Sequence, residues 1–345
     1  MALPFVSPII TNASSAVSAP ILIIGAAGFI GRFIAEASLA SKRPTYLLVR
    51  PSPTETKRNN VVKALEEKGA TTIFGSINDR DFMEKMLREH GIEVVVSTVG
   101  GAGILDQPIL VEAIKAVGTV KRFLPSEFGH DIDRADPVEP GLTFYNEKRK
   151  VRRLIEALGI PYTYICCNSI AAWPYYDNHH PSDVLPPLDQ IPIYGDGNKK
   201  AYFIDGVDIG KFTLKAIEDS RTINKCVHFR PPNNCLSINE LGSLWEKKLN
   251  RALPRVTISE DDLLAIAKEN DLPRSIVAAL THDIFINGCQ TNFCLDQPND
   301  LEVTSLYPDI PFKSISDCFD EFLVKVSHPV CKELKVVVLV YKPQN

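Results

Sequence analysis

Short hydrophobic runs alternate with segments of helical periodicity through the first half of the chain. The runs have the length of buried strands, and they lie at 21–24, 45–49, 71–75, 93–97, 122–125 and 162–167. Between them hydrophobic residues recur every three or four positions, which indicates helices near 33–39, 61–68, 79–90 and 107–117. Strands separated by helices of this length form βαβ units. The pattern predicts an α/β fold built on a Rossmann-like, doubly wound parallel sheet.

The pattern becomes less regular after residue 170. Prolines and aromatic residues crowd 171–195, where they could line a flat apolar ligand or simply pack as an irregular loop. A hairpin is predicted at 193–204, around Gly195 and Gly197, and a strand at 227–229. Further helices are predicted at 208–218, 236–249, 260–268 and 273–283, and Ser237 and Ser259 can cap the second and third of them. We expect a smaller C-terminal α/β domain here.

A glycine-rich loop follows the first strand and opens the first helix with the spacing GxxGxxG. Its seven residues are Gly25, Ala26, Ala27, Gly28, Phe29, Ile30 and Gly31. Glycines let the backbone approach a pyrophosphate, and a helix N-terminus offers amide groups and a partial positive charge. A plain turn would need only one of the three glycines. Strand, loop and helix in this order predict a dinucleotide site.

Basic residues follow the second strand, at the place where NAD-preferring proteins usually carry an acidic residue for the ribose 2′-hydroxyl. Arg50 ends the strand, and Lys57 and Arg58 come shortly after it. These side chains favour the 2′-phosphate of NADP(H), and the alternative is that they are solvated loop charges.

Ligands of open parallel sheets bind beyond the carboxyl ends of the strands. Three further segments in that position are therefore site candidates: 97–101, which begins with Ser97, 126–130, and 168–169.

Composition narrows the function classes. The chain has 345 residues, 45% of them hydrophobic, and a formal net charge of -4, which gives no electrostatic reason to expect nucleic acid or an anionic membrane as partner. No hydrophobic run reaches the ~20 residues that a membrane span needs. The eight cysteines include no CxxC pair, and no secretory leader is visible. We therefore expect reduced thiols, no metal site and a cytoplasmic location, while the oligomeric state is unknown.

The expected organisation has four parts. Residues 1–18 form a disordered tail, and 19–168 an NADP-binding Rossmann domain to which the chain returns later. Residues 169–328 are mainly a substrate-binding domain, and 329–345 are a tail of unknown role.

Lys148 lies in a helix whose apolar side is Val151, Ile155 and Leu158. The spacing puts its ammonium on or beside the buried face, where desolvation penalises the charged form. Such a lysine either has a chemical task or extends its charge to solvent along the edge of the core. His130 lies beyond the end of a strand, where it is either a catalyst or a structural hydrogen-bonding residue.

Three longer stretches carry a resemblance to a known family. They are Arg-Phe-Leu-Pro-Ser-Glu-Phe-Gly-His-Asp at 122–131, Ile-Cys-Cys-Asn-Ser-Ile-Ala-Ala-Trp-Pro-Tyr-Tyr at 165–176 and Thr-His-Asp-Ile-Phe-Ile-Asn-Gly-Cys at 281–289. With the glycine loop and the Lys148 helix, the chain resembles the plant isoflavone reductase-like enzymes. These are atypical short-chain dehydrogenases with an NmrA-like fold. Within them it is similar to the branch that acts on flavan-3,4-diols.

The resemblance implies an NADPH-dependent reductase that converts flavan-3,4-diols such as leucocyanidin into 2,3-trans-flavan-3-ols such as catechin. It implies Lys148 as catalytic lysine, Arg152 as a cofactor contact, and Arg50 with Arg58 or Lys57 at the 2′-phosphate. It also implies a substrate pocket lined by Tyr145, Asn168, Ser169 and Phe285.

The chemistry of a flavandiol suggests the roles of the two catalytic candidates. We expect Lys148 to take a phenol proton, so that water leaves C4 and a quinone methide forms. His130 is the expected acid for the departing hydroxyl, on the ground that a histidine can be protonated near neutrality. Two alternatives stay open: a sister reductase of isoflavones, lignans or phenylcoumaran ethers, and a non-catalytic NADP(H)-sensing protein of the same fold.

Overall fold

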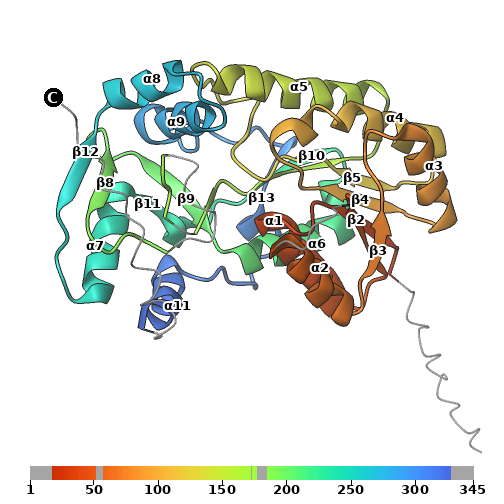
Figure 1. The fold of residues 1–345 in the computed structure, drawn as a ribbon, viewed down its shortest axis with the longest axis horizontal. Coiled ribbons are helices and arrows are strands. Elements are labelled where there is room, and N and C mark those ends of the chain that lie inside the picture. Colours follow the sequence, from red (N-terminus) through yellow and green to blue (C-terminus); the bar gives the residue numbers. More distant parts are fainter. Residues whose placement is uncertain (1–17, 52–56, 172, 177–184, 328–345) are drawn as a thin grey trace, which may run out of the picture.

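A parallel sheet forms the centre of the computed structural model, which describes residues 18–51, 57–171, 173–176 and 185–327 (Figure 1). Its five strands lie in the order β3-β2-β1-β4-β5. They are β1 (Ile21–Ile24), β2 (Thr45–Val49), β3 (Thr71–Phe74), β4 (Val94–Ser97) and β5 (Arg122–Leu124). Strand β1 is buried along its whole length because it pairs with β2 on one side and β4 on the other. All five strands lie where the hydrophobic runs predicted them.

A second parallel sheet continues the first. Its strands β6 (Thr163–Cys166), β10 (Lys225–His228) and β13 (Asp300–Glu302) lie in the order β13-β10-β6. A parallel bridge between Phe123 and Tyr162 joins β5 to the start of β6, and the Phe123 amide donates to the Pro161 carbonyl at 2.8 Å. The two sheets therefore form one parallel layer, and the chain returns to it twice after residue 220.

Helices cover both faces of this layer, which is what doubly wound means (Figure 1). The helices α1 (Phe29–Ala40), α2 (Lys57–Glu67) and α6 (Gly206–Glu218) contribute to one buried hydrophobic cluster. On the other face, a second cluster is built with α3 (Arg80–Glu89), α4 (Gln107–Val117) and α5 (Gly141–Ala157). Helices α1 and α6 come very close, because a Cβ at Gly210 would lie 2.3 Å from the Phe33 carbonyl oxygen. The predicted fold class is confirmed.

Most of the remaining elements surround a third hydrophobic cluster, whereas α10 packs in the first one through Val303. Strands β7 (Ser169–Ile170), β9 (Lys200–Ile204) and β11 (Cys235–Ser237) form a small mixed sheet, and β8 (Ile191–Tyr194) pairs with β12 (Arg255–Ile258). The helices here are α7 (Ile238–Leu249), α8 (Glu260–Lys268), α9 (Arg274–His282) and α11 (Ile315–Ser327), with the short α10 (Val303–Leu306) before the last. A π-helical turn, Asp283–Asn287, extends α9. Capping boxes at Ser237 and Ser259 begin α7 and α8 as the sequence predicted.

The predicted hairpin at 193–204 is wrong. Strands β8 and β9 flank the Gly195–Gly197 turn, but they belong to different sheets. Strand β8 pairs in parallel with β12, and β9 pairs with β7 and β11. The glycine turn was read correctly as a turn, but partners distant in sequence provide more burial than a local pairing does.

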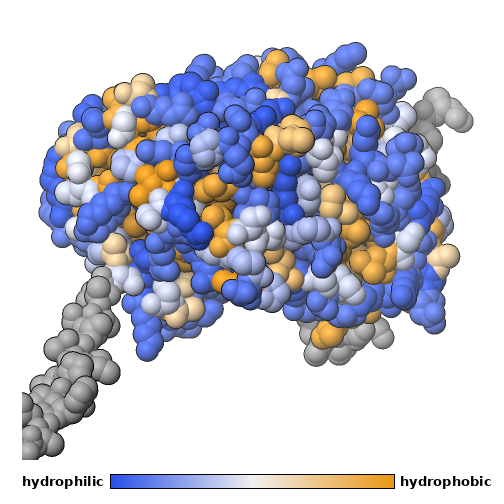
Figure 2. Space-filling model, turned by 180° about the vertical axis from the view of Figure 1, so that it is seen from behind, coloured by the Kyte–Doolittle hydropathy of each residue, from blue (hydrophilic) through white to orange (hydrophobic). Residues whose placement is uncertain are grey.

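Several predictions fall outside the described residues. They concern the two tails, 1–18 and 329–345, of which only Ser18 is described. The domain boundary near residue 168 remains a proposal. Among the described helices, none is long and apolar enough to cross a bilayer. Figure 2 shows hydrophobic residues as separate patches between hydrophilic ones on one face, the ordinary mixed surface of a globular protein.

Candidate functional site

The glycine loop has the backbone geometry that its sequence predicts. Gly25 has φ +87°, and a Cβ on it would lie 2.7 Å from Thr98 Oγ1. A Cβ on Gly31 would lie 2.3 Å from the Gly25 carbonyl oxygen. Helix α1 can therefore approach the end of β1 only because both positions lack a side chain. The N-terminus of α1, at Phe29, opens directly beyond this loop.

A cavity of about 620 Å³ lies beside the loop, where the strand order reverses between β1 and β4. Its walls come from the glycine loop and from the ends of the neighbouring strands, and include Gly25, Ala26, Ala27, Gly28, Leu48, Arg50, Ser76, Thr98, Val99 and Gly100. The volume and position suit a dinucleotide.

Of the predicted cofactor residues outside the glycine loop, some lie at the cavity and others do not. Arg50 is exposed at the cavity rim, as expected for a phosphate contact. Arg58 lies in α2, but its side chain, like that of Lys57, is outside what the structure describes. Ser97 does not reach the cavity: it is fully buried in β4, and its Oγ makes no hydrogen bond in the described part of the chain. The next residue, Thr98, lines the cavity instead, because successive strand residues point to opposite faces.

Lys148 lies in α5 with its ammonium directed at the loop that follows β5. Its Nζ donates to the Glu127 carbonyl oxygen at 3.2 Å and lies 5.5 Å from the centre of the Phe144 ring. Burial lowers the pKa of Lys148, and the nearby Arg152 cation adds to that effect while Glu127 opposes it. The same loop is fixed to the cavity wall, because Ser126 Oγ donates to the Val99 carbonyl at 2.5 Å. Helix α5 therefore places Lys148 against the loop that borders the dinucleotide cavity. Because its pKa is lowered, more of this lysine is in the neutral form that can act as a base.

His130 is held by Tyr145, which lies three residues before Lys148 on the same helix. The Tyr145 hydroxyl and His130 Nε2 are 2.6 Å apart, and both side chains are buried. Burial lowers the pKa of His130 to about 4, helped by the positive charge of Lys148 and opposed by Asp131. Burial also raises the pKa of Tyr145. The ring is therefore neutral at physiological pH, and the expectation that His130 is protonated near neutrality is wrong. The tautomer of the neutral ring sets which of the two groups donates in this bond.

Two residues that the sequence analysis did not assign meet His130. Side-chain atoms of His130, Asp283 and Cys289 lie within 4.8 Å of one another, and all three residues are buried. Burial raises the pKa of Asp283 and of Cys289. Both residues belong to the stretch 281–289 that carries the family resemblance, so a signal for them was present in the sequence.

Arg152 does not fit the expected role of cofactor contact. Its guanidinium is 2% exposed and bonds three carboxylates, Glu127 at 2.9 Å, Asp131 at 2.8 Å and Asp133 at 3.0 Å. It also lies 4.5 Å from the centre of the Tyr164 ring. Its contacts are with the loop between β5 and α5 (125–140), here named the catalytic loop because it carries His130, the proposed catalytic histidine, and Arg152 holds that loop against α5.

The expected substrate residues are spread over two regions. Asn168 has φ +62°, and it is bound by its amide to the Gly129 carbonyl at 2.9 Å, next to His130. Ser169 accepts a hydrogen bond from Gln290 at 2.9 Å. Phe285 is buried against Tyr194, with ring centres 5.3 Å apart, in the third hydrophobic cluster. Their contact with a substrate stays a prediction.

A dinucleotide cavity at a parallel sheet, with a histidine on the adjoining loop and a lysine on the helix that follows it, defines the class: a Rossmann-fold oxidoreductase. The chain belongs to the NmrA-like family, whose model matches residues 18–323. The resemblance inferred from the sequence is thereby confirmed.

Particular relatives are more informative than the family. The chain is 62% identical over 305 residues to leucoanthocyanidin reductase of Desmodium uncinatum, covering 88% of this chain and 80% of that protein. It is similar to the binary complex of leucoanthocyanidin reductase with NADPH from Vitis vinifera, with TM-score 0.85, 63% identity and coverage of 88% and 99%. A phenylcoumaran benzylic ether reductase of Ginkgo biloba is 42% identical over 88% of this chain and 98% of its own length.

Proposed function

We propose that the protein is a leucoanthocyanidin reductase, an enzyme that uses NADPH to reduce flavan-3,4-diols such as leucocyanidin at C4 to 2,3-trans-flavan-3-ols such as catechin. The observation that carries the proposal is that Lys148 and Tyr145 of α5 meet His130 and Glu127 of the loop that borders the dinucleotide cavity. The identity of 62% to a leucoanthocyanidin reductase supports the choice of substrate class.

The residues around the cavity fit NADPH. Amides at the N-terminus of α1 and the glycine loop suit the pyrophosphate, and Arg50 at the rim suits the 2′-phosphate. When bound, the cofactor supplies a hydride to C4 of the substrate.

The protein's part in the reaction is to move protons. Lys148 is the base: its lowered pKa makes the neutral amine accessible, and the amine takes the proton of a phenol on the A ring. The phenolate then directs electrons toward C4 and the C4 hydroxyl leaves. Lys148 takes one proton from the phenol, and the departing hydroxyl receives one proton. The net change is the loss of water, which leaves a quinone methide.

Because His130 is neutral, we assign it another role than the charged acid expected from the sequence. A ring with pKa about 4 does not stand ready as a charged acid. It can accept the hydrogen bond of Tyr145 at Nε2 and present its other nitrogen as a neutral N–H donor to the C4 hydroxyl. In this role it polarises the bond that breaks, and the net proton comes from Lys148.

The deciding experiment is chiral analysis of the products formed from leucocyanidin with NADPH. Formation of the 2,3-trans-flavan-3-ol supports the proposal. A preference for an isoflavone, a pinoresinol-type lignan or a phenylcoumaran ether would assign the protein to the sister reductases instead. No NADPH oxidation with any of them would indicate a non-catalytic NADP(H)-binding protein. A cysteinyl-flavanol conjugate, with a thiol as leaving group, belongs in the same panel.

The location also remains a proposal. The seven described cysteines are all free thiols, which agrees with the reducing cytosol.

A further inference from the structure

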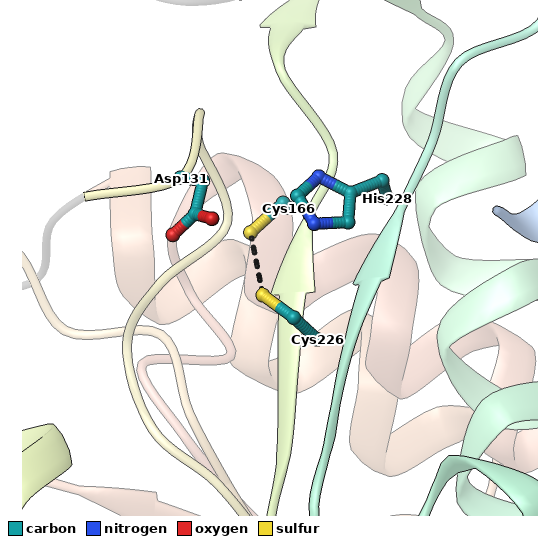
Figure 3. Close-up of side chains that lie close together, drawn as sticks. All are labelled: Asp131, Cys166, Cys226 and His228. Carbon is teal, nitrogen blue, oxygen red and sulfur yellow. Dashed lines mark hydrogen bonds between the residues drawn. The ribbon is translucent and has the colours of Figure 1, made fainter. Parts of the chain in front are cut away.

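A group of buried side chains with metal-ligating atoms lies between the loop after β5 and the strands β6 and β10 (Figure 3). It consists of Asp131, Cys166, Cys226 and His228, here named the β6–β10 cluster. Their ligating atoms all lie within 4.8 Å of one another. None of the four has a part in the proposed reaction.

The sheet brings three of these side chains to one face. Cys226 and His228 are two residues apart on β10 and so point to the same side. In the register of the parallel pair, His228 lies opposite Cys166 on the neighbouring strand β6. Asp131 comes from the loop after β5, and Figure 3 shows its carboxylate facing the two sulfur atoms. Four ligands of three chemical types therefore converge from two strands and one loop.

The imidazole of His228 is enclosed by the protein. His228 is 1% exposed, and its Nε2 is buried without a hydrogen bond in the described part of the chain. Asp300 Oδ1 lies 3.4 Å from this nitrogen, so a charged histidine there would have a carboxylate beside it. The case for a metal therefore depends on the convergence of the four ligating groups.

We propose that the β6–β10 cluster binds one zinc ion through four protein ligands, Asp131, Cys166, Cys226 and His228. Two sulfurs, one nitrogen and one oxygen form a donor set that suits a borderline-soft divalent cation in tetrahedral geometry. With four protein ligands the site has no open position, so the metal is structural and not catalytic. It would tie the loop that carries His130 to β6 and β10.

The sulfur positions distinguish this site from a disulfide. Cys166 Sγ and Cys226 Sγ are 3.4 Å apart, close to the roughly 3.8 Å that two thiolates sharing a tetrahedral zinc would have. The two cysteines occupy diagonal positions on neighbouring strands, because Cys226 lies opposite Tyr164 and not opposite Cys166. Such positions are roughly 7–8 Å apart, too far for a disulfide unless the backbone moves.

The charged groups around Asp131 are compatible with a metal ion in the β6–β10 cluster. Arg152 Nη1 bonds Asp131 Oδ1 at 2.8 Å, and Arg134 Nε lies 3.5 Å from Asp131 Oδ2. Oδ1 also accepts from the Asp133 amide at 3.2 Å, so Oδ2 is the oxygen that Asp131 would give to a metal, with loss of its longer contact to Arg134. On binding, each thiol releases its proton to solvent and no electrons are transferred, so affinity must fall as the pH falls.

The test measures metal directly in the whole protein. The full chain is purified under reducing conditions without chelators, its zinc is quantified by mass spectrometry, and cobalt(II) is then titrated into the metal-free form. We expect about one zinc per chain, and a cobalt spectrum with a thiolate charge-transfer band and the strong visible bands of tetrahedral coordination.

Variants locate the metal. Cys226→Ser and His228→Gln should each weaken cobalt binding at least roughly tenfold. The matched control is Cys294→Ser, which removes an exposed cysteine outside the cluster and should leave binding unchanged. NADPH binding by each variant reports whether it is folded.

Three outcomes would overturn the proposal. They are a wild-type protein that contains no zinc and takes up no cobalt, metal binding that survives both substitutions in the cluster, and a Cys166–Cys226 disulfide in the protein isolated without reductant. The wild-type measurement does not depend on the folding of any variant, and none of these readouts requires the proposed substrate.

Discussion

Burial lowers the pKa of both Lys148 and His130, with different consequences for the two groups. Desolvation lowers the pKa of both, which makes the lysine a better base and removes the charge of the histidine. The two groups are close enough to influence each other, because Lys148 contributes to the lowering at His130. A base beside a neutral donor is the arrangement that a phenol and a departing hydroxyl require.

Lys148→Met should lower kcat with leucocyanidin by about 10²–10⁴, because it removes the general base. NADPH affinity, measured by fluorescence titration, should stay nearly the same. The control is Lys150→Met on the same helix, whose side chain is 69% exposed and paired with Glu147. Turnover by the Lys148 variant at the wild-type rate would exclude the lysine as base.

His130 should make the protein sensitive to acid. Its pKa is about 4 in the folded state against 6.5 for the free side chain, so the unfolded chain takes up the proton first as the pH falls. The stability that depends on the neutral ring is complete above about pH 6.5 and is lost between about pH 6.5 and pH 4, on the order of 3 kcal/mol. Urea denaturation across that range measures it. In His130→Gln the loss should be smaller, and an unchanged pH dependence would contradict the assignment.

At the level of elements, Arg152 joins α5 to the loop between β5 and α5. Its three carboxylate partners are all loop residues, and one of them, Glu127, also supplies the carbonyl that receives Lys148. The loop and the helix are therefore positioned relative to each other by one buried cation.

Arg152→Met should destabilise the fold by about 3–5 kcal/mol, because it leaves buried carboxylates without a partner. The neighbour Arg153 is a matched control: it also bonds Asp133, but its side chain is 58% exposed, so Arg153→Met should cost at most about 1 kcal/mol. Chemical denaturation of both variants measures the two changes in the free energy of unfolding. Equal effects would mean that the buried network contributes no more than a surface pair.

The glycine loop makes a prediction about α1. Gly31→Ala places a Cβ 2.3 Å from the Gly25 carbonyl oxygen, whereas the same change at Gly28 places it at 3.2 Å. Overpacking of this kind costs about 1–3 kcal/mol, and it would push α1 away from β1. Gly31→Ala should therefore lose both stability and NADPH affinity, measured by thermal shift and titration. Gly28→Ala should lose clearly less, and the reverse order would contradict the geometry.

For the whole molecule, the cavity lies at the carboxyl ends of β1 to β4, beside the glycine loop and between helices of the two faces. A ligand there contacts elements from both faces of the fold, so its binding should stabilise the entire layer.

NADPH at about 100 times its Kd should raise the free energy of unfolding by about 2.7 kcal/mol, because it binds only the folded state. At equal concentration NADH should give a smaller shift in Tm. Arg50→Ser should reduce the difference between the two cofactors, since Arg50 lies at the cavity rim. Equal shifts with NADH and NADPH in the wild-type protein would contradict the preference for the 2′-phosphate.

Local signals were sufficient where a function depends on consecutive residues. The glycine loop, the strand runs and the capping serines could all be predicted, because strand period, backbone freedom and capping act over a few positions. Pairing of β8 with β12 could not be predicted, since its partners are about sixty residues apart and only burial selects them. The same holds for Ser97, whose burial depends on which face of β4 is covered.

By itself the sequence determined the fold class and the dinucleotide loop, and it named the lysine and the histidine of the proposed reaction. Only the tertiary structure decided their chemical state, because a pKa depends on burial and on neighbours that come from other elements. Arg152 became a structural cation because three carboxylates of one loop surround it. Cys226 and His228, sixty residues from Cys166, became a candidate metal site only because parallel strands place them side by side.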